Sequence, residues 1–399
     1  MVSFFKKHEL DELAIFYLEA FISGALAVIM PFTVIYFLDV GLSYLQISII
    51  FAVYGISTFL LEIPTGALAD EYSRKVSVII GFFIMGLASI LIPFTNSFFA
   101  ILICWVFVGL GSTFRSGSDV AWVMDNLKVN KRKKLEKEYF AKWQSILYAG
   151  FIVAPLIGSF IVKHFSMDLL WYVFGSGQFI AAFILMVVPE KLKSKNNSVK
   201  QAIKNNFKTA KQGFKHIQKS RNLMLIIVSG IFMSIGIMAQ DGWTPLMVDF
   251  VGFPIESIGY FMSAFAAIMV LIPIISKRFT DEKKVLIITT VFQFLFLAGA
   301  LILKRGMFVW AVIIFILPEL FAGIRHPVKS HLIQKLIPSK IRATTTSIQN
   351  MVDVGFGSLF GLIGGYLLDV FPIHLVIGFS SFFIIGVVYS YSKLEIKKK

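Results

Sequence analysis

The feature that most constrains this chain is a series of apolar stretches, each long enough to cross a lipid bilayer. A spanning helix needs about 20 mainly apolar residues. Twelve such stretches occur, six before and six after a polar break at 190–221. They fall near 12–38, 45–69, 76–95, 97–124, 141–163, 168–189, 222–248, 255–276, 285–303, 307–328, 343–368 and 373–392. The pattern predicts an all-α integral membrane protein with twelve transmembrane helices.

Composition excludes the other broad classes of protein. Of the 399 residues, 57% are hydrophobic and 15% are charged, whereas soluble domains carry about 25% charged residues. The 42 phenylalanines exclude a disordered chain, because disordered segments are poor in aromatic residues. Cys104 is the only cysteine, which excludes a disulfide scaffold. Because it lies beside Trp105 in an apolar stretch, its thiol is expected to pack rather than to react.

The net charge of +15 is explained by the loops between the spans. Thirty-three of the 38 lysines and arginines fall on one side of the predicted membrane, and three fall on the other. The remaining two, Arg115 and Arg325, lie within apolar stretches. Loops rich in lysine and arginine stay in the cytoplasm, so both termini are expected on the cytoplasmic side. The protein is expected to be a multi-pass protein of the plasma or inner membrane. Since this charge reflects topology, no nucleic-acid partner is expected.

Internal echoes indicate that the chain consists of two related halves. KVSVII from Lys75 is echoed by KVLIIT from Lys284, at an offset of 209 residues. LIGS from Leu156 is echoed by LIGG from Leu362, at an offset of 206 residues. Duplicated halves around a midplane site are typical of secondary transporters. The sequence therefore predicts a six-helix bundle on each side of the polar break.

The break itself is expected to be a cytoplasmic linker at 191–221, between an N-terminal bundle at 1–190 and a C-terminal bundle at 222–399. Ten basic residues lie in it. Its apolar residues at helical spacing are Ile203, Phe207, Ala210, Phe214 and Ile217. This pattern favours an amphipathic helix on the inner leaflet, where anionic lipid attracts lysine. A regulatory or partner-binding helix is the alternative.

The segment between the second and third spans reads EIPTGALADEYSRK. It resembles the signature loop of the major facilitator superfamily, which has the form Gly-x-x-x-Asp-x-x-Gly-Arg-Lys. The matching residues are Gly66, Asp70, Arg74 and Lys75. Glu71 and Ser73 depart from the pattern. The segments GSTFRSGSDVAWVMDNL and IPSKIRATTTSIQNM also resemble members of this superfamily. The resemblance thus covers essentially the whole chain and favours prokaryotic drug:H+ antiporter-like members.

The resemblance implies two pseudo-symmetric six-helix bundles that work by alternating access, with a gate at the signature loop. The expected gating residues are Gly66, Asp70, Arg74, Lys75 and Asp125. Gly66 is expected to let two helices approach closely. Asp70 is expected to face the positive end of the helix that begins near Arg342, and Arg74 to reach Asp125 at the end of the fourth span. The alternative is a charged, solvated turn without a gating role.

The fifth span contains GFIVAPLIGS, from Gly150 to Ser159. This segment is similar to the antiporter-associated motif Gly-x-x-x-Gly-Pro-x-x-Gly-Gly. Ala154 and Ser159 replace two glycines, but every position remains small. Close helix packing and a kink at Pro155 are therefore expected. Ordinary packing of small residues remains the alternative to an antiporter role.

Several charged residues lie inside the apolar stretches, where a carboxylate costs roughly 2.5–3.5 kcal/mol. Four of them share one depth in the N-terminal half, roughly 10–15 Å from the inner surface at about 1.5 Å per residue. These proton-coupling candidates are Glu19, Glu62, Arg115 and Asp119. Arg115 and Asp119 are expected to be i,i+4 neighbours on one helix face. Because one arginine cannot neutralise three carboxylates, at least one acid is expected to be protonated part of the time. A structural ion-pair network is the alternative.

Further charged and polar residues lie in the C-terminal half. Because spans 1, 4, 7 and 10 line the central cavity in the superfamily, the resemblance makes four of them substrate-cavity candidates. These are Gln240, Asp241, Trp243 and Glu319. An apolar cavity with a few acids suits lipophilic, neutral or cationic compounds. Arg325 and His326 are expected to snorkel at the inner end of span 10, and the direction of Asp353 stays open.

What the sequence lacks also limits the function. The sequence has no Gly-x-x-x-x-Gly-Lys-Ser/Thr loop to bind ATP and no cluster of metal ligands. No cofactor or metal is therefore expected, and the proton gradient is the expected energy source. The sequence predicts a non-enzymatic, monomeric, proton-coupled exporter whose partners are a small lipophilic substrate and the lipid bilayer. An importer, or a metabolite or lysolipid carrier on the same fold, is the alternative. A membrane sensor or enzyme is disfavoured by the gate signature.

Overall fold

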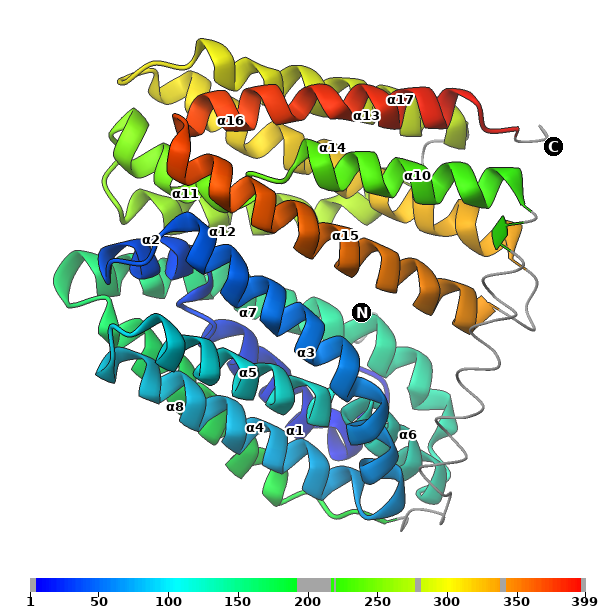
Figure 1. The fold of residues 1–399 in the computed structure, drawn as a ribbon. Coiled ribbons are helices and arrows are strands. Elements are labelled where there is room, and N and C mark those ends of the chain that lie inside the picture. Colours follow the sequence, from blue (N-terminus) through cyan, green and yellow to red (C-terminus); the bar gives the residue numbers. More distant parts are fainter. Residues whose placement is uncertain (1–4, 192–216, 219, 277–280, 338–341, 396–399) are drawn as a thin grey trace. The chain divides into compact units, whose positions relative to one another are not determined.

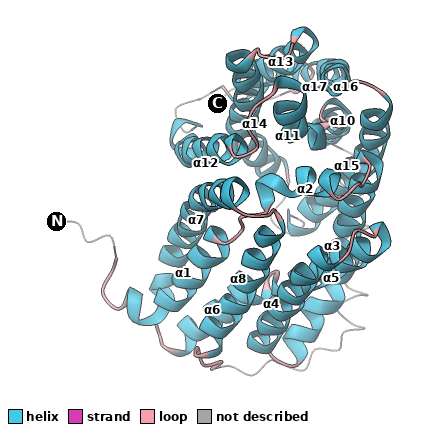
Figure 2. Cartoon of the chain, turned by 90° about the vertical axis from the view of Figure 1, so that its left-hand side faces the viewer, coloured by secondary structure: helices cyan, strands magenta, loops and turns pink. Residues whose placement is uncertain are grey.

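The computed structural model describes residues 5–191, 217–218, 220–276, 281–337 and 342–395, and every regular element in these residues is a helix (Figure 2). Eleven of these helices are long and apolar enough to cross a membrane. The remaining predicted span is α12 (Ser257–Ser276), whose part Ser257–Val270 counts as a shorter apolar helix. The predicted all-α membrane fold is confirmed. The amphipathic linker helix predicted within 191–221 falls largely outside the described residues.

Large apolar side chains cover the outer surface of the helices. Phe94 and Val309, for example, leave 72% and 76% of their surface exposed. Soluble proteins rarely expose contiguous apolar patches of more than a few hundred Å². The many exposed phenylalanines, leucines and isoleucines of this chain are instead suited to contact with lipid tails.

Packing divides the described residues into two compact units. The first is drawn from Met1–Thr33, Val53–Ile203 and Met262–Ala266, and the second from Val34–Ala52, Lys204–Phe261 and Ala267–Lys399. Helix α3 (Tyr44–Glu71) begins in the second unit and continues in the first. The predicted division into six-helix bundles at 1–190 and 222–399 stays a prediction.

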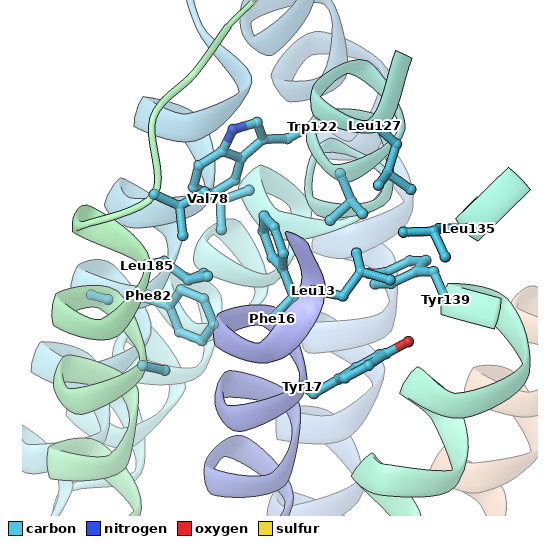
Figure 3. Packing of buried hydrophobic residues seen from close by; sticks show 14 residues of the cluster. Leu13, Phe16, Tyr17, Val78, Phe82, Trp122, Leu127, Leu135, Tyr139 and Leu185 are labelled. Carbon is cyan, nitrogen blue, oxygen red and sulfur yellow. The ribbon is translucent and has the colours of Figure 1, made fainter. Parts of the chain in front are cut away.

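The first unit packs around a cluster of aromatic and aliphatic side chains. Besides the later part of α3, its elements are α1 (Glu9–Ala25), α4 (Arg74–Leu91), α5 (Phe98–Arg115), α6 (Ser118–Val129), α7 (Glu136–His164), α8 (Asp168–Met186) and 3-10 turns at Met30–Phe32, Ile92–Phe94 and Lys133–Leu135. Phe16 of α1 meets Trp122 of α6 edge to face at 5.4 Å, and Tyr17 of α1 stacks on Tyr139 of α7 (Figure 3). Buried aromatic pairs of this kind hold α1 in place, and α1 carries the first acid of the candidate site.

The second unit contains most of the helices after the polar break. Its elements are α2 (Thr33–Asp39), the start of α3, α10 (Arg221–Gly236), α11 (Trp243–Pro245), most of α12, α13 (Glu282–Ala298), α14 (Phe308–Leu336), α15 (Arg342–Val370), α16 (Ile373–Ser380), α17 (Ile384–Ser392), 3-10 turns at Gln240–Gly242, Gly299–Ile302 and Ser381–Phe383, and a π-helical turn at Leu246–Val251 (Figure 1). Ser220 and Asp281 are the N-caps of α10 and α13, because each side chain accepts a hydrogen bond from a backbone N–H of the first turn.

The fourth span consists of two helices. α5 ends at Arg115 and α6 begins at Ser118, and Gly117 between them has a φ of 73°. A positive φ interrupts a right-handed helix and favours glycine. The expected i,i+4 pairing of Arg115 and Asp119 on one helix face is therefore wrong, because the helix is broken between these residues.

The seventh span is interrupted as well. α10 ends at Gly236, and a 3-10 turn at Gln240–Gly242, the short α11 and the π-helical turn follow it. Irregular backbone at membrane depth is tolerated where it is buried in protein or lines a water-filled cavity. The interruption contains the polar residues Gln240, Asp241, Thr244 and Asp249, and the first two of these are substrate-cavity candidates.

Candidate functional site

A buried carboxylate on α1 forms the centre of the candidate site in the first unit. Only 5% of the surface of Glu19 is exposed. Ser23, one turn later on the same helix, donates a hydrogen bond to Oε1 of Glu19 at 2.7 Å. A guanidinium nitrogen of Arg115 lies 3.6 Å from the same oxygen. Glu19 thus has one neutral donor and one loosely placed cationic partner, an arrangement in which its charge is only partly compensated.

Arg115 ends α5 and lies over an aromatic ring. Its guanidinium carbon is 3.8 Å from the centre of the Phe82 ring, at a distance typical of a cation–π contact. Its Nε is buried without a hydrogen-bond partner among the described residues. Asp119 lies just beyond the break, in the first turn of α6, where the positive end of the helix dipole favours a carboxylate. The broken fourth span thus supplies both an arginine and a second acid.

Glu62 does not join this cluster. It lies on an exposed face of α3, and no hydrogen bond or ion pair connects it with Glu19, Arg115 or Asp119 among the described residues. Of the four predicted proton-coupling residues, the structure thus connects Glu19 directly with Arg115 and places Asp119 across the break. Counting residues gave the depth of Glu62, but it could not give the direction in which its side chain points.

The signature loop joins three helices of the first unit through Arg74. Its guanidinium bonds to Oδ1 of Asp70 at 2.9 and 3.1 Å and also pairs with Asp125 of α6. Lys75 donates to the carbonyl of Met186, the last residue of α8, at 2.6 Å. The predicted contact between Arg74 and Asp125 is present. No described atom lies within 4 Å of a Cβ placed on Gly66, so the close helix approach expected there is not found.

The sequence interpretation missed Glu190, which follows the sixth span directly. Its carboxylate accepts hydrogen bonds from Ser73 Oγ at 2.5 Å and from the backbone N–H of Arg74 at 2.8 Å. Ser73 itself caps α4 by accepting from the N–H of Val76 at 3.0 Å. This explains why serine can stand where the signature usually has glycine. An acid directly after a span could have indicated such a helix cap, but the sequence did not show which helix it would reach.

A second missed acid lies at the start of α1. Glu9 is fully buried, and Lys142 of α7 donates to both of its carboxylate oxygens at 2.7 Å. The hydroxyl of Tyr17 adds a bond of 3.0 Å, and Lys142 also pairs with Glu138 at 3.1 Å. This network ties α1 to α7. Because Glu9 precedes the first apolar stretch, its burial could not be inferred from hydropathy.

The small residues of the fifth span pack tightly against span 1. A Cβ on Gly150 would lie 2.6 Å from the backbone N of Ala25, and one on Gly158 would lie 2.8 Å from the carbonyl oxygen of Val28. Real Cβ atoms do not approach backbone atoms so closely, so only glycine fits at these two positions. The predicted close packing is present.

In the second unit, three of the four substrate-cavity candidates line one pocket. Gln240, Trp243 and Glu319 line it together with Ser380 and the apolar side chains of Leu297 and Ile377, and its cavity of about 10 Å³ has room for no more than a water molecule. Asp241 is not part of this lining. The pocket combines a carboxylate, an amide and an indole, which are groups suited to an organic cation. No group of three His, Cys, Asp or Glu side chains is placed to hold a metal ion in the described part of the chain.

Arg325 does not snorkel. It is only 8% exposed, it donates to Oε1 of the buried Gln293 of α13, and one of its nitrogens lies 3.9 Å from the sulfur of Met233. The prediction failed because α14 continues to Leu336, eleven residues past Arg325, so this arginine lies within the helix and not near its inner end. Asp353 also points inward, because its Oδ1 lies 2.9 Å from the position of a Cβ on Gly230 of α10.

Known proteins resemble this chain in sequence. The sequence model of the Major Facilitator Superfamily matches residues 15–361. The chain belongs to this superfamily. An uncharacterized MFS-type transporter of Bacillus subtilis, YxaM, is 23% identical over 94% of this chain and 93% of its own length. A bicyclomycin resistance protein homolog of Haemophilus influenzae is 22% identical over 61% of this chain and 59% of its own length.

Solved structures give the same fold. The nucleoside transporter NupG superposes with a TM-score of 0.76 at 14% identity, over 98% of this chain and 100% of that chain. At such low identity the likeness shows the fold alone. Family and fold together establish a membrane transporter of the major facilitator superfamily and not an enzyme.

Proposed function

We propose that this chain is a proton-coupled exporter of small lipophilic compounds that works by alternating access. The observation that carries the proposal is the cluster of Glu19, Ser23, Arg115 and Asp119 in an otherwise apolar interior. Intramembrane acids of this kind are costly and mark proton or substrate pathways. Two acids beside one arginine leave an excess of negative charge, which a proton can neutralise.

In this mechanism Glu19 alternates between two states. It is ionised and paired with Arg115 in one state, and it is protonated and released from Arg115 in the other. Ser23 can donate to the ionised carboxylate and accept from the protonated one, so its hydroxyl serves both states. Each cycle would bring protons inward as the substrate leaves.

The side chains of Gln240, Trp243 and Glu319, which line one small pocket, have the chemistry for a lipophilic and often cationic substrate. Glu319 supplies the opposite charge, and the indole of Trp243 supplies a face for a cation or an aromatic ring. The resistance protein among the relatives supports export of a drug-like compound. Import is the competing direction, and no contact among the described residues favours it.

Inverted membrane vesicles test this proposal. A pH gradient is formed by respiration, and ethidium or tetraphenylphosphonium is then added as a lipophilic cation. We expect the gradient to be dissipated in vesicles that contain the protein and to persist in vesicles that contain the Glu19→Gln variant at equal amount. An unchanged gradient with a broad set of cationic and neutral compounds would contradict export. Proton-coupled uptake into right-side-out vesicles instead would establish an importer.

A further inference from the structure

The turn between the fourth and fifth spans carries a dense patch of exposed positive charge. The ten residues 128–137 contain six cations and one acid, Glu136. The six cations, here called the basic turn, are Lys128, Lys131, Arg132, Lys133, Lys134 and Lys137. All six are exposed, and none forms a hydrogen bond or ion pair through its side chain with another residue that the structure describes. The described part of the chain thus leaves this charge uncompensated.

Backbone hydrogen bonds and two buried leucines hold the basic turn in one conformation. The N–H of Arg132 bonds to the carbonyl of Leu127 at 2.8 Å. The N–H of Lys131 bonds to the carbonyl of Lys128 at 3.1 Å, which completes a Schellman motif at the end of α6. Leu127 and Leu135, on either side of the turn, are 1% and 5% exposed and belong to the hydrophobic cluster of the first unit (Figure 3). The cations are therefore displayed on a fixed framework.

Lys131 occupies a position at which glycine is favoured. Its φ is 56°, and the residue at this position of a Schellman motif is usually glycine because a Cβ is disfavoured there. A lysine in this conformation lowers the free energy of unfolding. Backbone strain of this kind clusters at functional sites, and here the strained residue adds a cation to the middle of the basic turn.

Helix stability does not account for the cations that lie toward α7. This helix begins at Glu136, and the N-terminal end of a helix favours acids and disfavours cations. Lys133, Lys134 and Lys137 all lie at this end. They repel one another as well as the helix dipole, and an anion against the turn would relieve both repulsions.

Apolar side chains beside the basic turn indicate what kind of anion this is. Val129 exposes 41% of its surface, and Phe140, three residues after Lys137 on α7, exposes 56%. Exposed apolar side chains on a spanning helix are suited to lipid tails, whereas lysine and arginine beside them reach the level of the headgroups. An anion at the turn would thus lie one helical turn from a surface for its own apolar tail, which favours a lipid over a soluble polyanion.

We propose that the basic turn is a binding site for the headgroup of an anionic phospholipid. The planar guanidinium of Arg132 is suited to donate two hydrogen bonds to phosphate oxygens. The lysines supply a field that favours a lipid of net negative charge over a zwitterionic one, whose own cation they repel. This site needs neither substrate nor proton gradient, so it would remain if the direction of transport were reversed.

Native mass spectrometry of the full-length protein tests the site. The protein is released from detergent micelles that contain phosphatidylglycerol and phosphatidylcholine with identical tails in equal amounts, and the bound lipids are counted. We expect the parent to retain phosphatidylglycerol at least about tenfold more strongly. The preference should shrink as salt is added to the micelles. Equal retention of the two lipids at low salt would overturn the proposal.

Removal of four cations tests where the lipid binds. The combined variant is Lys131→Gln, Arg132→Gln, Lys133→Gln and Lys134→Gln. Because each cation near a headgroup contributes about fivefold, the preference for phosphatidylglycerol should disappear. The matched control removes the same charge from the polar break as Lys193→Gln, Lys195→Gln, Lys200→Gln and Lys204→Gln, and it should retain the preference. Equal loss in both variants would show a general attraction to basic protein and would overturn the site.

Lys131→Gly separates lipid binding from stability. Glycine relieves the strain at a φ of 56°, so the melting temperature in detergent should rise by about 2 °C. The preference for phosphatidylglycerol should nevertheless fall by about fivefold, because one cation is lost. The control Lys137→Gln should weaken the preference to a similar degree without raising the melting temperature. A more stable Lys131→Gly protein with the lipid preference of the parent would contradict a headgroup at the turn.

Discussion

Each of the two units has an arginine in a corresponding span, and the two arginines have different partners; Arg115 is partly buried and Arg325 is buried. Arg115 ends the first helix of span 4, and Arg325, 210 residues later, lies in span 10. In the first unit the partner is the carboxylate of Glu19, with Asp119 across the helix break. In the second unit the hydrogen-bond partners are the amide oxygen of Gln293 and the sulfur of Met233, and the carboxylate of Glu319 adds an electrostatic attraction.

This difference assigns different tasks to the two units. The amide of Gln293 cannot change its charge, so its hydrogen bond with Arg325 does not depend on the uptake or release of a proton. A carboxylate beside an arginine can take up or release a proton, and each change alters the attraction between them. The comparison teaches that a duplicated framework can keep one arginine as a structural anchor and use the other as part of a switch.

The largest expected effect is on the stability of the first unit. Arg115→Leu removes the cation that partly compensates the buried Glu19 and should cost about 3 kcal/mol, as expected when one partner of a buried pair is lost. Arg325→Leu leaves the amide of Gln293 unpaired and removes the attraction to Glu319, and it should cost about 1–2 kcal/mol. Thermal unfolding in detergent, followed by loss of the monodisperse peak in size-exclusion chromatography, measures both. Equal losses of stability in the two variants would contradict the proposed difference between the two arginines.

The second largest effect is expected on the coupling of proton movement to substrate transport. Glu19→Gln keeps the shape of the side chain and removes its charge, so proton-driven transport should fall by about 100-fold, which corresponds to about 2.7 kcal/mol. The matched change in the second unit is Gln293→Leu, which should leave proton-driven transport within about threefold of the parent. Initial rates in energised vesicles, at equal protein content, measure both variants. A large loss of coupling in Gln293→Leu would place part of the switch in the second unit.

A smaller effect is expected at the signature loop, whose charged contacts belong to the first unit. Asp70→Asn removes one of the two acids that hold Arg74, and transport should fall by about tenfold while expression stays intact. In the second unit, Asp281 precedes the echo KVLIIT and caps the helix that contains it. Asp281→Asn keeps a capping side chain and should leave transport nearly unchanged. Unaltered transport by Asp70→Asn in vesicles would refute a gating role.

The smallest effect is expected where Glu190 supports the cap of α4. Glu190→Gln retains an acceptor but loses the negative charge at the helix N-terminus, which is worth about 0.5–1 kcal/mol. The melting temperature should fall slightly at low salt, and the difference should shrink as salt is added. A drop in transport far beyond the drop in stability would show that Glu190 takes part in gating.

The fold could be predicted almost completely from the sequence, because hydropathy determines which segments enter a bilayer. The last span was expected at 373–392, and the helices from Ile373 to Ser392 occupy these residues. The break at Gly117 was not foreseen, since a glycine in an apolar span is compatible with a continuous helix. Its conformation is fixed only by the packing around it.

The candidate site was predicted in composition but not in geometry. Glu19 and Arg115 were expected together and are found together. Glu62 is exposed on α3 and makes no contact with the cluster, because sequence spacing gives height along a helix but not the rotation of the helix in its bundle. Arg325 was placed near a helix end that lies eleven residues further on. Glu190 and Asp369 accept hydrogen bonds from residues more than 100 positions away in the sequence. No local sequence pattern predicts such distant partners.

The most direct test of the account uses purified protein in liposomes with a pH-sensitive dye inside. The vesicles are loaded with tetraphenylphosphonium and diluted, so that an outward substrate gradient exists without a pH gradient. We predict that protons move inward as the substrate leaves through the parent protein and the Gln293→Leu variant, whereas Glu19→Gln moves substrate slowly and no protons. Proton movement through Glu19→Gln at the rate of the parent would contradict the assignment of Glu19 as the coupling residue.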